Sequence, residues 1–118
     1  MLMNERQLIR SLEDAVRELL SAGYPTVKQG ARRVGISVRT LQRRLHRHGL
    51  TYSELVERVR DEEACRLLQE HSRSIAEIAA RLGYSDPSHF SRAFRRWEGV
   101  CPRTYQRSFK AACDGHGH

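Results

Sequence analysis

The sequence predicts an all-α fold of about seven helices, arranged as two helix-turn-helix subdomains joined by a long connector helix. First, one pattern in residues 27–55 occurs again in 75–105. Second, apolar residues recur at three- and four-residue spacing, and no segment shows the convincing alternation of a strand. Third, the prolines, at positions 25, 87 and 102, stand at expected helix starts or in loops.

The two copies of the pattern share small and apolar residues at matching places. Ala31, Gly35, Ser37, Leu41, Leu45 and Gly49 match Ala79, Gly83, Ser85, Phe90, Phe94 and Gly99. Repeats of this size indicate a duplicated supersecondary unit. A small residue, a glycine turn and a second amphipathic helix are what the close crossing of a helix-turn-helix requires.

The first three helices are expected, in order, over 4–22, 26–34 and 37–48. Gly23 and the following proline end the first, whose leucines and valine recur on one face. Thr26 and Gln29 form a capping box for the second helix. Gly35 permits a left-handed turn, after which Ser37 caps the third.

The remaining helices are expected over 51–71, 74–82, 86–98 and from 102 to about 111. Thr51 with Glu54 and Ser74 with Glu77 form further capping boxes. A proline follows Asp86 at the first helical position, where it is favoured. The expected organisation is residues 1–50 with the first helix-turn-helix, 51–71 as connector, 72–111 with the second, and 112–118 as a disordered tail.

The connector sets an expected geometry on DNA. About twenty residues at 1.5 Å each give a helix of about 30 Å. That length is close to the ~34 Å turn of B-DNA. The two second helices are therefore expected to enter successive major grooves, so that a monomer covers a long, non-palindromic site.

Charge favours a polyanionic partner. The formal net charge is +7, with 19 Arg against 2 Lys. Segment 37–48 carries four arginines and no acid, whereas 51–71 carries six acids and three arginines. Double-stranded DNA is the expected partner. No apolar run approaches a membrane span and no signal peptide opens the chain, so the expected compartment is the cytoplasm, without a membrane partner.

No cofactor, metal or catalytic activity is expected. Cys65, Cys101 and Cys113 are odd in number and lack C-x-x-C spacing, so they indicate neither disulfides nor a zinc knuckle. Cys65 is interpreted as a small buried side chain. His116 and His118 near Cys113 are far more typical of a mobile tail than of a metal site. Serines, histidines and aspartates are scattered without a nucleophile motif.

Polar residues on the second helix of each repeat have the chemistry that base edges require. Arg binds guanine O6 and N7, and Gln suits adenine. Because residues near the helix start reach the groove floor, the expected base or groove contacts are Arg39, Thr40, Gln42, Arg43, Ser88, His89 and Arg92. The expected contacts with the DNA backbone are Ser37, Arg47, Thr51, Ser91 and Arg96.

Other prominent residues have structural interpretations. Phe90, Phe94 and Trp97 share one helical face and are expected in the core rather than as stacking platforms. Arg60 lies in an apolar and acidic helix and is expected to pair with nearby carboxylates.

These residues also carry a family resemblance. The stretch R-T-L-Q-R-R-L after Ser37, Arg60 with Ala64, and I-A-E-I-A-A-R-L-G-Y-S-D-P-S-H-F-S-R-A-F-R-R-W-E-G-V-C-P resemble the DNA-binding domain of the AraC/XylS transcription regulators. The resemblance covers about 5–109 and implies two helix-turn-helix lobes, DNA binding and transcription activation through contact with RNA polymerase. Cys101 stands where the family has a Ser cap. Gly30 replaces larger apolar residues, which predicts a less tightly packed first lobe.

The leading hypothesis is therefore a sequence-specific transcription regulator, favoured as an activator by the resemblance, whose segment is monomeric. One alternative is a DNA-targeting module of a larger enzyme, such as a repair methyltransferase or recombinase. Another is a structural protein that binds DNA without sequence preference. A stand-alone regulator and the C-terminal part of a longer one are both compatible with the sequence.

Overall fold

The computed structural model describes residues 4–116, with side chains described to residue 109. Over this range it is all-α. The helices are α1 (Glu5–Leu19), η1 (Leu20–Ala22, a 3-10 turn), α2 (Val27–Val34), α3 (Val38–Arg47), α4 (Tyr52–Glu70), α5 (Ile75–Arg81), α6 (Pro87–Glu98) and α7 (Pro102–His116). The predicted fold class is confirmed, including the long connector, which is α4.

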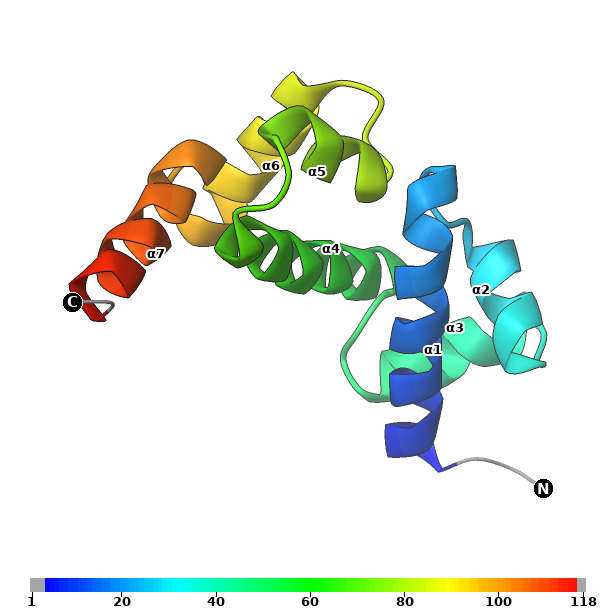
Figure 1. The fold of residues 1–118 in the computed structure, drawn as a ribbon. Helices are drawn as coiled ribbons and strands as arrows, with labels where there is room; N and C mark the ends of the chain where they lie inside the picture. Colours follow the sequence, from blue (N-terminus) through cyan, green and yellow to red (C-terminus); the bar gives the residue numbers. More distant parts are fainter. Residues whose placement is uncertain (1–3, 117–118) are drawn as a thin grey trace. The chain divides into compact units, whose positions relative to one another are not determined.

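Two compact units divide the chain, residues 1–60 and 61–118, and the boundary falls within α4. In the first unit, α2 and α3 pack beside α1, as the blue and cyan ribbons of Figure 1 show. Leu8 and Leu12 of α1, Leu41 of α3 and Leu55 of α4 are fully buried. Leu8 and Leu12 lie one helical turn apart, so α1 packs through a single apolar stripe.

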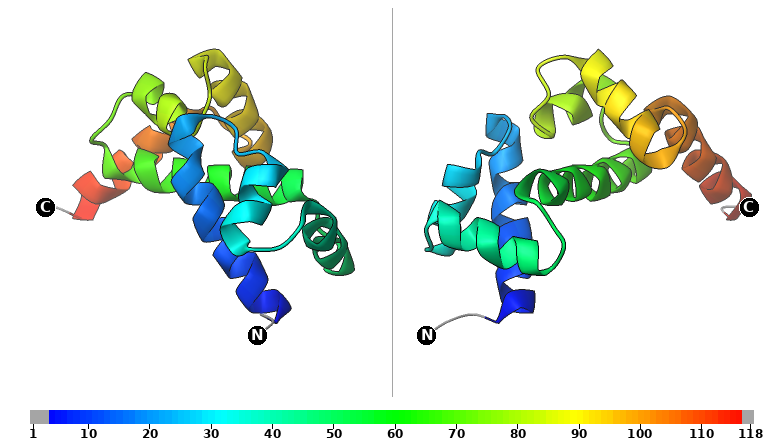
Figure 2. Two further views of the ribbon diagram at one scale, coloured as in Figure 1. Left: turned by 90° about the vertical axis from the view of Figure 1, so that its right-hand side faces the viewer. Right: turned by 180° about the vertical axis from the view of Figure 1, so that it is seen from behind.

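The second unit is built around aromatic side chains of α6. Phe90 and Phe94 are fully buried, and their ring centroids lie 5.9 Å apart. Tyr105 of α7 meets Phe94 edge-on at 5.3 Å, an arrangement that aromatic quadrupoles favour. Trp97 stacks edge-on against Phe94 but is only half-buried, so it borders the core. Figure 2 shows α5 and α6 joined by their short loop.

Side-chain caps define the helix starts as predicted. Thr26, Ser74 and Asp86 each accept a hydrogen bond from the first turn of the helix that follows. Asn4 and Gln7 form a further capping box at α1 that the sequence analysis did not name. The capping residues therefore fix where the helices begin.

The C-terminal helix extends further than expected. α7 continues past Ala111 to His116, and the two successive alanines at 111 and 112 have the highest helix propensity of any residue. The predicted tail over 112–118 thus overlaps this helix, and its last two residues, including His118, lie outside the described range. The side chains of Cys113 and His116 lie outside it as well.

The expectation of a loosely packed first lobe is wrong. A Cβ atom on Gly30 would lie 2.9 Å from Tyr52 Cε1 and 3.1 Å from Leu12 Cδ1. Tyr52 fills the space that a larger residue would take, and its hydroxyl donates to the carbonyl oxygen of Pro25 at 2.8 Å. The glycine is required because a tyrosine ring from α4 lies directly against α2.

Two further side chains refine the expectations. Arg60 is 8% exposed, and its guanidinium carbon lies 5.1 Å from the ring centroid of Tyr24. It is structural as expected, and the aromatic face of Tyr24 is one of its partners. Cys65 is half-buried rather than fully enclosed. No helix in the described part of the chain has both the length and the apolar character needed to cross a bilayer.

Candidate nucleic-acid interface

The turn between the paired helices has the same hydrogen bonds in both repeats. The Ile36 amide donates to the carbonyl of Ala31 at 3.1 Å, and the Tyr84 amide donates to that of Ala79 at 3.0 Å. Gly35 and Gly83 occupy the left-handed region, with φ of 77° and 86°. These bonds across the end of the first helix identify a Schellman-type stop in each repeat. The duplication seen in the sequence is therefore a duplication of backbone geometry.

The first repeat presents a polar face on α3. Leu41 and Leu45 are buried on one side of the helix. The exposed side chains opposite them are Arg39, Gln42, Arg43, His46 and Arg47. Their i, i+3, i+4, i+7 spacing places Arg39, Gln42, Arg43 and His46 on one stripe. Four of these five residues were predicted to contact DNA, whereas His46 was missed.

Arg44 belongs to a different side of the same helix. Its Nη2 atom lies 2.7 Å from Glu5 Oε1, and its side chain is 11% exposed. This ion pair ties α3 to α1 and lowers the pKa of Glu5, chiefly through the hydrogen bond from Arg44. Arg44 therefore stabilises the unit and leaves the polar stripe of α3 on the opposite side.

Capping engages three hydroxyl groups that were expected to meet DNA. Ser37 caps α3 through the amide of Thr40, and its hydroxyl also donates to Thr40 Oγ1 at 2.9 Å. Thr51 accepts from the amide of Glu54 at 3.1 Å, and its own amide donates to Glu54 Oε1. The Thr51 amide is thus used within the protein, while its hydroxyl hydrogen remains able to donate.

The start of α4 lies beside the polar stripe of α3. Gln42 and Thr51 line one surface hollow of about 370 Å³, together with Tyr52 of α4 and Thr26 at the start of α2. His46 lines an adjoining hollow with Gln42 and Thr51. The structure therefore brings Thr51 and Gln42 together, although they are nine positions apart in the sequence.

The second repeat presents the matching face on α6. Asp86 Oδ1 accepts from the Ser88 amide at 2.8 Å, and this bond lowers the pKa of Asp86. The exposed residues opposite the aromatic core are Ser88, His89, Arg92, Arg95 and Arg96, and Ser91 is half-buried. Arg95 was missed by the sequence reasoning. It follows Ser88 by seven residues, as His46 follows Arg39, so helical spacing alone would have found both.

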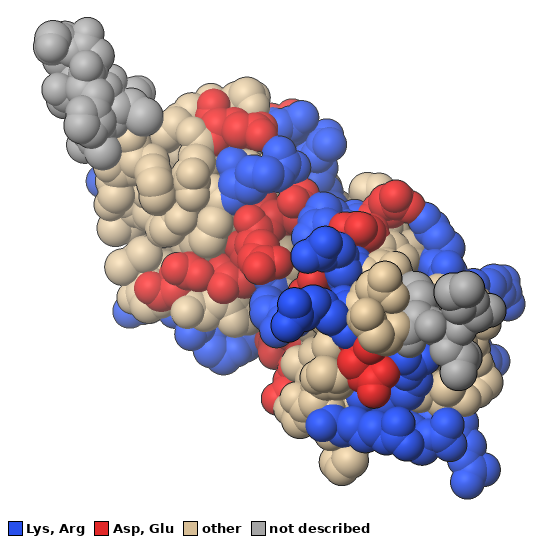
Figure 3. Space-filling model, turned by 90° about the horizontal axis from the view of Figure 1, so that it is seen from below, with Lys and Arg blue, Asp and Glu red and all other residues tan. Residues whose placement is uncertain are grey.

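The two faces are equivalent in position and different in chemistry. An offset of 49 residues matches Arg43 with Arg92 and Arg47 with Arg96. The same offset replaces Arg39 by Ser88 and Gln42 by Ser91. Over the wider surface, basic and acidic side chains alternate rather than forming one uninterrupted patch on the face drawn in Figure 3. The exposed side chains therefore differ in chemistry between two helices that occupy equivalent positions.

A separate cluster of ionisable groups joins α4 to α6 within the second unit. Ligand-type atoms of Asp61, Cys65 and Glu98 all lie within 4.8 Å of one another. Burial, followed by the hydrogen bond with Glu98, raises the pKa of Asp61 to about 7. Two carboxyl groups share a hydrogen bond only if one holds a proton. Burial likewise raises the pKa of the Cys65 thiol to about 11, and Cys65 Sγ lies 3.6 Å from Asp61 Oδ1.

The hydrogen-bonded pair of Asp61 and Glu98 predicts that the free energy of unfolding falls as pH rises. The pKa of Asp61 is about 7 in the folded chain against an ordinary 3.8, so the folded state holds a proton that the unfolded state releases. The stabilisation is complete below pH 3.8 and is lost as pH rises through about 7. Replacing Asp61 with Asn is expected to remove this decline and to add about 1 kcal/mol at high pH, allowing for solvent screening.

Urea unfolding at a series of pH values measures the difference between the two proteins. Glu57→Gln, at an exposed position of the same helix, is the matched control and should keep the wild-type profile. If the free energy of unfolding of Asp61→Asn followed pH in parallel with that of the wild type, Asp61 and Glu98 would not share a proton.

The arrangement defines a class of protein: two helix-turn-helix units, each presenting an exposed polar helix of the kind that enters a DNA groove. A family model described as "Helix-turn-helix domain" matches residues 30–108. The chain belongs to the AraC/XylS family of transcription regulators, of which it forms a DNA-binding domain. Among its relatives, the regulator VirS of Mycobacterium tuberculosis is 40% identical over 90 residues, which is 76% of this chain and 26% of VirS.

Two further similarities are informative. The transcriptional activator RhaS of Salmonella arizonae is 42% identical over 74 residues, which cover 62% of this chain and 27% of RhaS. The DNA-binding domain of the global transcriptional factor AdpA, solved in complex with a target DNA, superposes with a TM-score of 0.73 at 28% identity, covering 88% of this chain and 94% of that one. The chain spans about a quarter of the length of the curated relatives it matches.

Proposed function

We propose that this domain reads a specific, asymmetric double-stranded DNA site through two different recognition helices. The observation that carries the proposal is the pair of equivalent polar faces on α3 and α6, each exposed beside a glycine turn of the same geometry. Proteins that bind DNA without sequence preference rely on charge alone. Here glutamine, serine and histidine accompany the arginines, and these side chains suit donors and acceptors on base edges.

The proposed roles follow position along each helix. Arg43 and Arg92 bind guanine O6 and N7, and Gln42 binds adenine. Arg39, Ser88 and His89, near the helix starts, reach base edges. Thr40 contributes its methyl group and its hydroxyl hydrogen, because its oxygen only accepts from Ser37 within the cap. The backbone contacts proposed are Ser37, Arg47, Thr51, Ser91 and Arg96.

The two helices are proposed to enter successive major grooves with the domain acting as a monomer. α4 is a continuous helix over Tyr52–Glu70, about 28 Å long at 1.5 Å per residue. Successive grooves on one face of B-DNA recur every ~34 Å. We further propose that the intact protein activates transcription through RNA polymerase, a role supported by the similarity to RhaS, which is a transcriptional activator.

Footprinting tests the proposal. A single domain on genomic fragments is expected to protect discrete sites of about two helical turns, with two protected grooves on one face. Uniform protection of all fragments would identify a protein without sequence preference. Protection of one turn only would exclude simultaneous reading by α3 and α6.

Arg96 provides a separate test of the backbone contacts. Because Arg96 is exposed one turn after Arg92, replacing it with Ala is expected to reduce the slope of log K against log salt by about one. Affinity should fall to a similar degree on all DNA sequences. Arg17→Ala is the control, since Arg17 of α1 pairs with Asp14 at 3.0 Å and has no proposed contact with DNA. An unchanged slope for Arg96→Ala would remove this residue from the backbone contacts.

A further inference from the structure

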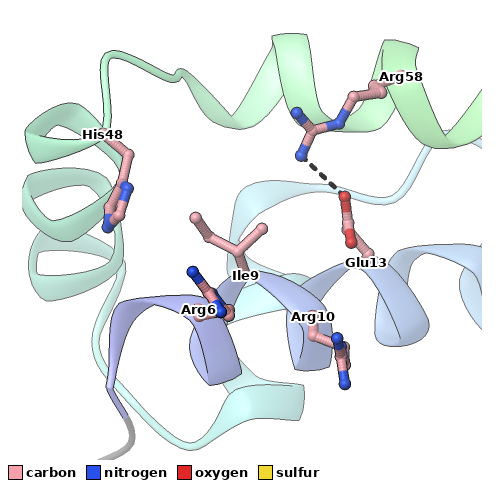
Figure 4. A pocket seen from close by; sticks show the side chains of 6 residues that line it. All are labelled: Arg6, Ile9, Arg10, Glu13, His48 and Arg58. Atoms are coloured by element: carbon pink, nitrogen blue, oxygen red, sulfur yellow. Dashed lines mark hydrogen bonds and ion pairs between the residues drawn. The ribbon is translucent and has the colours of Figure 1, made fainter.

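A basic hollow lies on the first unit, on the side of α3 that faces α1. It has a volume of about 390 Å³ and is lined by Arg6, Ile9, Arg10, Glu13, His48 and Arg58. Figure 4 shows that these side chains come from α1, from the end of α3 and from α4. None of them belongs to the polar stripe of α3.

The position of His48 separates this hollow from the reading face. His48 follows Arg44 by four residues and therefore lies one turn further along the side of α3 that faces α1. That side is fixed by the ion pair between Arg44 and Glu5. Arg39 and His46 project from the opposite side of α3. A DNA groove filled by the polar stripe thus leaves the hollow open.

Positive charge is in excess inside the hollow. Arg6, Arg10 and Arg58 line it, against one carboxylate, Glu13, among the described residues. Glu13 Oε2 already accepts from Arg58 Nη2 at 2.8 Å, as the dashed line in Figure 4 marks. Arg6 and Arg10 are exposed. Each presents a planar fork of donors, which matches the two oxygens of a carboxylate.

Helix stability does not account for Arg6. Arg6 lies in the first turn of α1, where Glu5 is the only acidic residue of that turn. The positive end of the helix dipole disfavours a cation there. Like charges one turn apart, such as Arg6 and Arg10, also repel each other. Residues that oppose local stability are expected where a partner compensates for them.

An apolar side chain in the hollow indicates the kind of partner. Ile9 is half-buried and lines the hollow beside Arg6 (Figure 4). A DNA backbone offers phosphates and sugars but no branched aliphatic side chain for this position. An amphipathic helix offers both carboxylates and leucine-type side chains, at the spacing with which a helix fills a groove.

We propose that this hollow docks an acidic amphipathic segment of a partner protein while α3 and α6 are engaged with DNA. Carboxylates of the segment pair with Arg6 and Arg10, and an apolar side chain rests on Ile9. The surface is distinct from the DNA-reading faces, so its role holds or fails independently of the base contacts.

The probe is a fluorescein-labelled peptide of leucine and glutamate in helical spacing, titrated by anisotropy. Wild-type domain is expected to bind it, and a copy with glutamine in place of glutamate should not bind. Arg6→Gln with Arg10→Gln is expected to weaken binding at least about tenfold. The matched control is Arg103→Gln with Arg107→Gln, two exposed arginines of α7 with the same four-residue spacing, and should change it less than about twofold.

A variant that binds the peptide more tightly is a control for misfolding, because a misfolded domain would lose peptide binding. Glu13→Gln removes the one acidic group of the hollow and releases Arg58, so peptide affinity should rise about threefold. Equal weakening of peptide binding by the two double variants would overturn the proposal. A wild-type domain that does not bind the peptide would also overturn it. Displacement of the peptide by duplex DNA would also overturn it and assign the hollow to the DNA backbone.

Discussion

Replacing Arg43 with Ala is expected to weaken binding to the preferred DNA site by about 1–3 kcal/mol, while binding to random DNA changes much less. Arg43 is exposed at the centre of the polar stripe of α3, one turn after Arg39 and opposite the buried Leu41 and Leu45. A bidentate arginine on guanine discriminates strongly because the wrong base leaves a donor unpaired. Arg92, at the equivalent place on α6, is expected to behave in the same way.

Competitive binding assays with a preferred site and a scrambled duplex measure this difference. Arg47→Ala is the matched control, since Arg47 lies one turn further along α3 and is also exposed. As a proposed backbone contact, it should weaken both duplexes equally. An Arg43→Ala variant that also loses equally on both would show that Arg43 meets phosphate rather than a base.

Replacing Gly30 with Val is expected to destabilise the first unit by about 2–3 kcal/mol. The Cβ atom would lie 2.9 Å from a ring carbon of Tyr52, whose position is fixed by hydrogen bonds to the carbonyls of Pro25 and Thr26. Valine favours a helix more than glycine does, but only by a few tenths of a kcal/mol. Steric overlap with a buried ring therefore decides the sign.

Thermal and urea unfolding measure the effect. Arg32→Val introduces the same side chain at an exposed place on α2 and should cost well under 1 kcal/mol. Tyr52→Leu combined with Gly30→Val is expected to recover part of the loss, because the shorter side chain makes room. A Gly30→Val protein as stable as the wild type would mean that α4 does not pack tightly against α2.

Local sequence signals predicted most of the backbone. Gly35 and Gly83 predicted tight turns after the first helix of each repeat, and both glycines have a left-handed conformation. Thr26 and Ser74, each with a partner three residues later, announced capping boxes that the structure forms. Such signals act within four residues of chain, so they need no knowledge of tertiary packing. Apolar spacing predicted which face of each helix is buried for the same reason.

Features that depend on residues distant in sequence were not predicted. Gly30 looked like a packing defect because its neighbour Tyr52 comes from another helix. The approach of Asp61 to Glu98 joins α4 with α6, and no spacing rule relates positions so far apart. The basic hollow likewise draws on three helices.

Ten of the twelve candidate DNA-contacting residues lie exposed on the expected helices or at their starts, so they stay candidates for contact with DNA. The structure adds His46 and Arg95 as exposed positions on the same faces, and it shows that the Ser37 hydroxyl accepts from the Thr40 amide and donates to Thr40 Oγ1. Exposure and capping geometry decide these points, and neither is visible in residue type alone.

Selection of bound sequences from a random DNA pool tests the central claim, that two non-equivalent helices read one asymmetric site. The wild-type domain is expected to select a non-palindromic motif with two conserved blocks about one helical turn apart. Arg43→Ala should relax one block only, and Arg92→Ala the other only. A palindromic motif, or variants that each relax both blocks, would contradict the assignment of separate half-sites to α3 and α6.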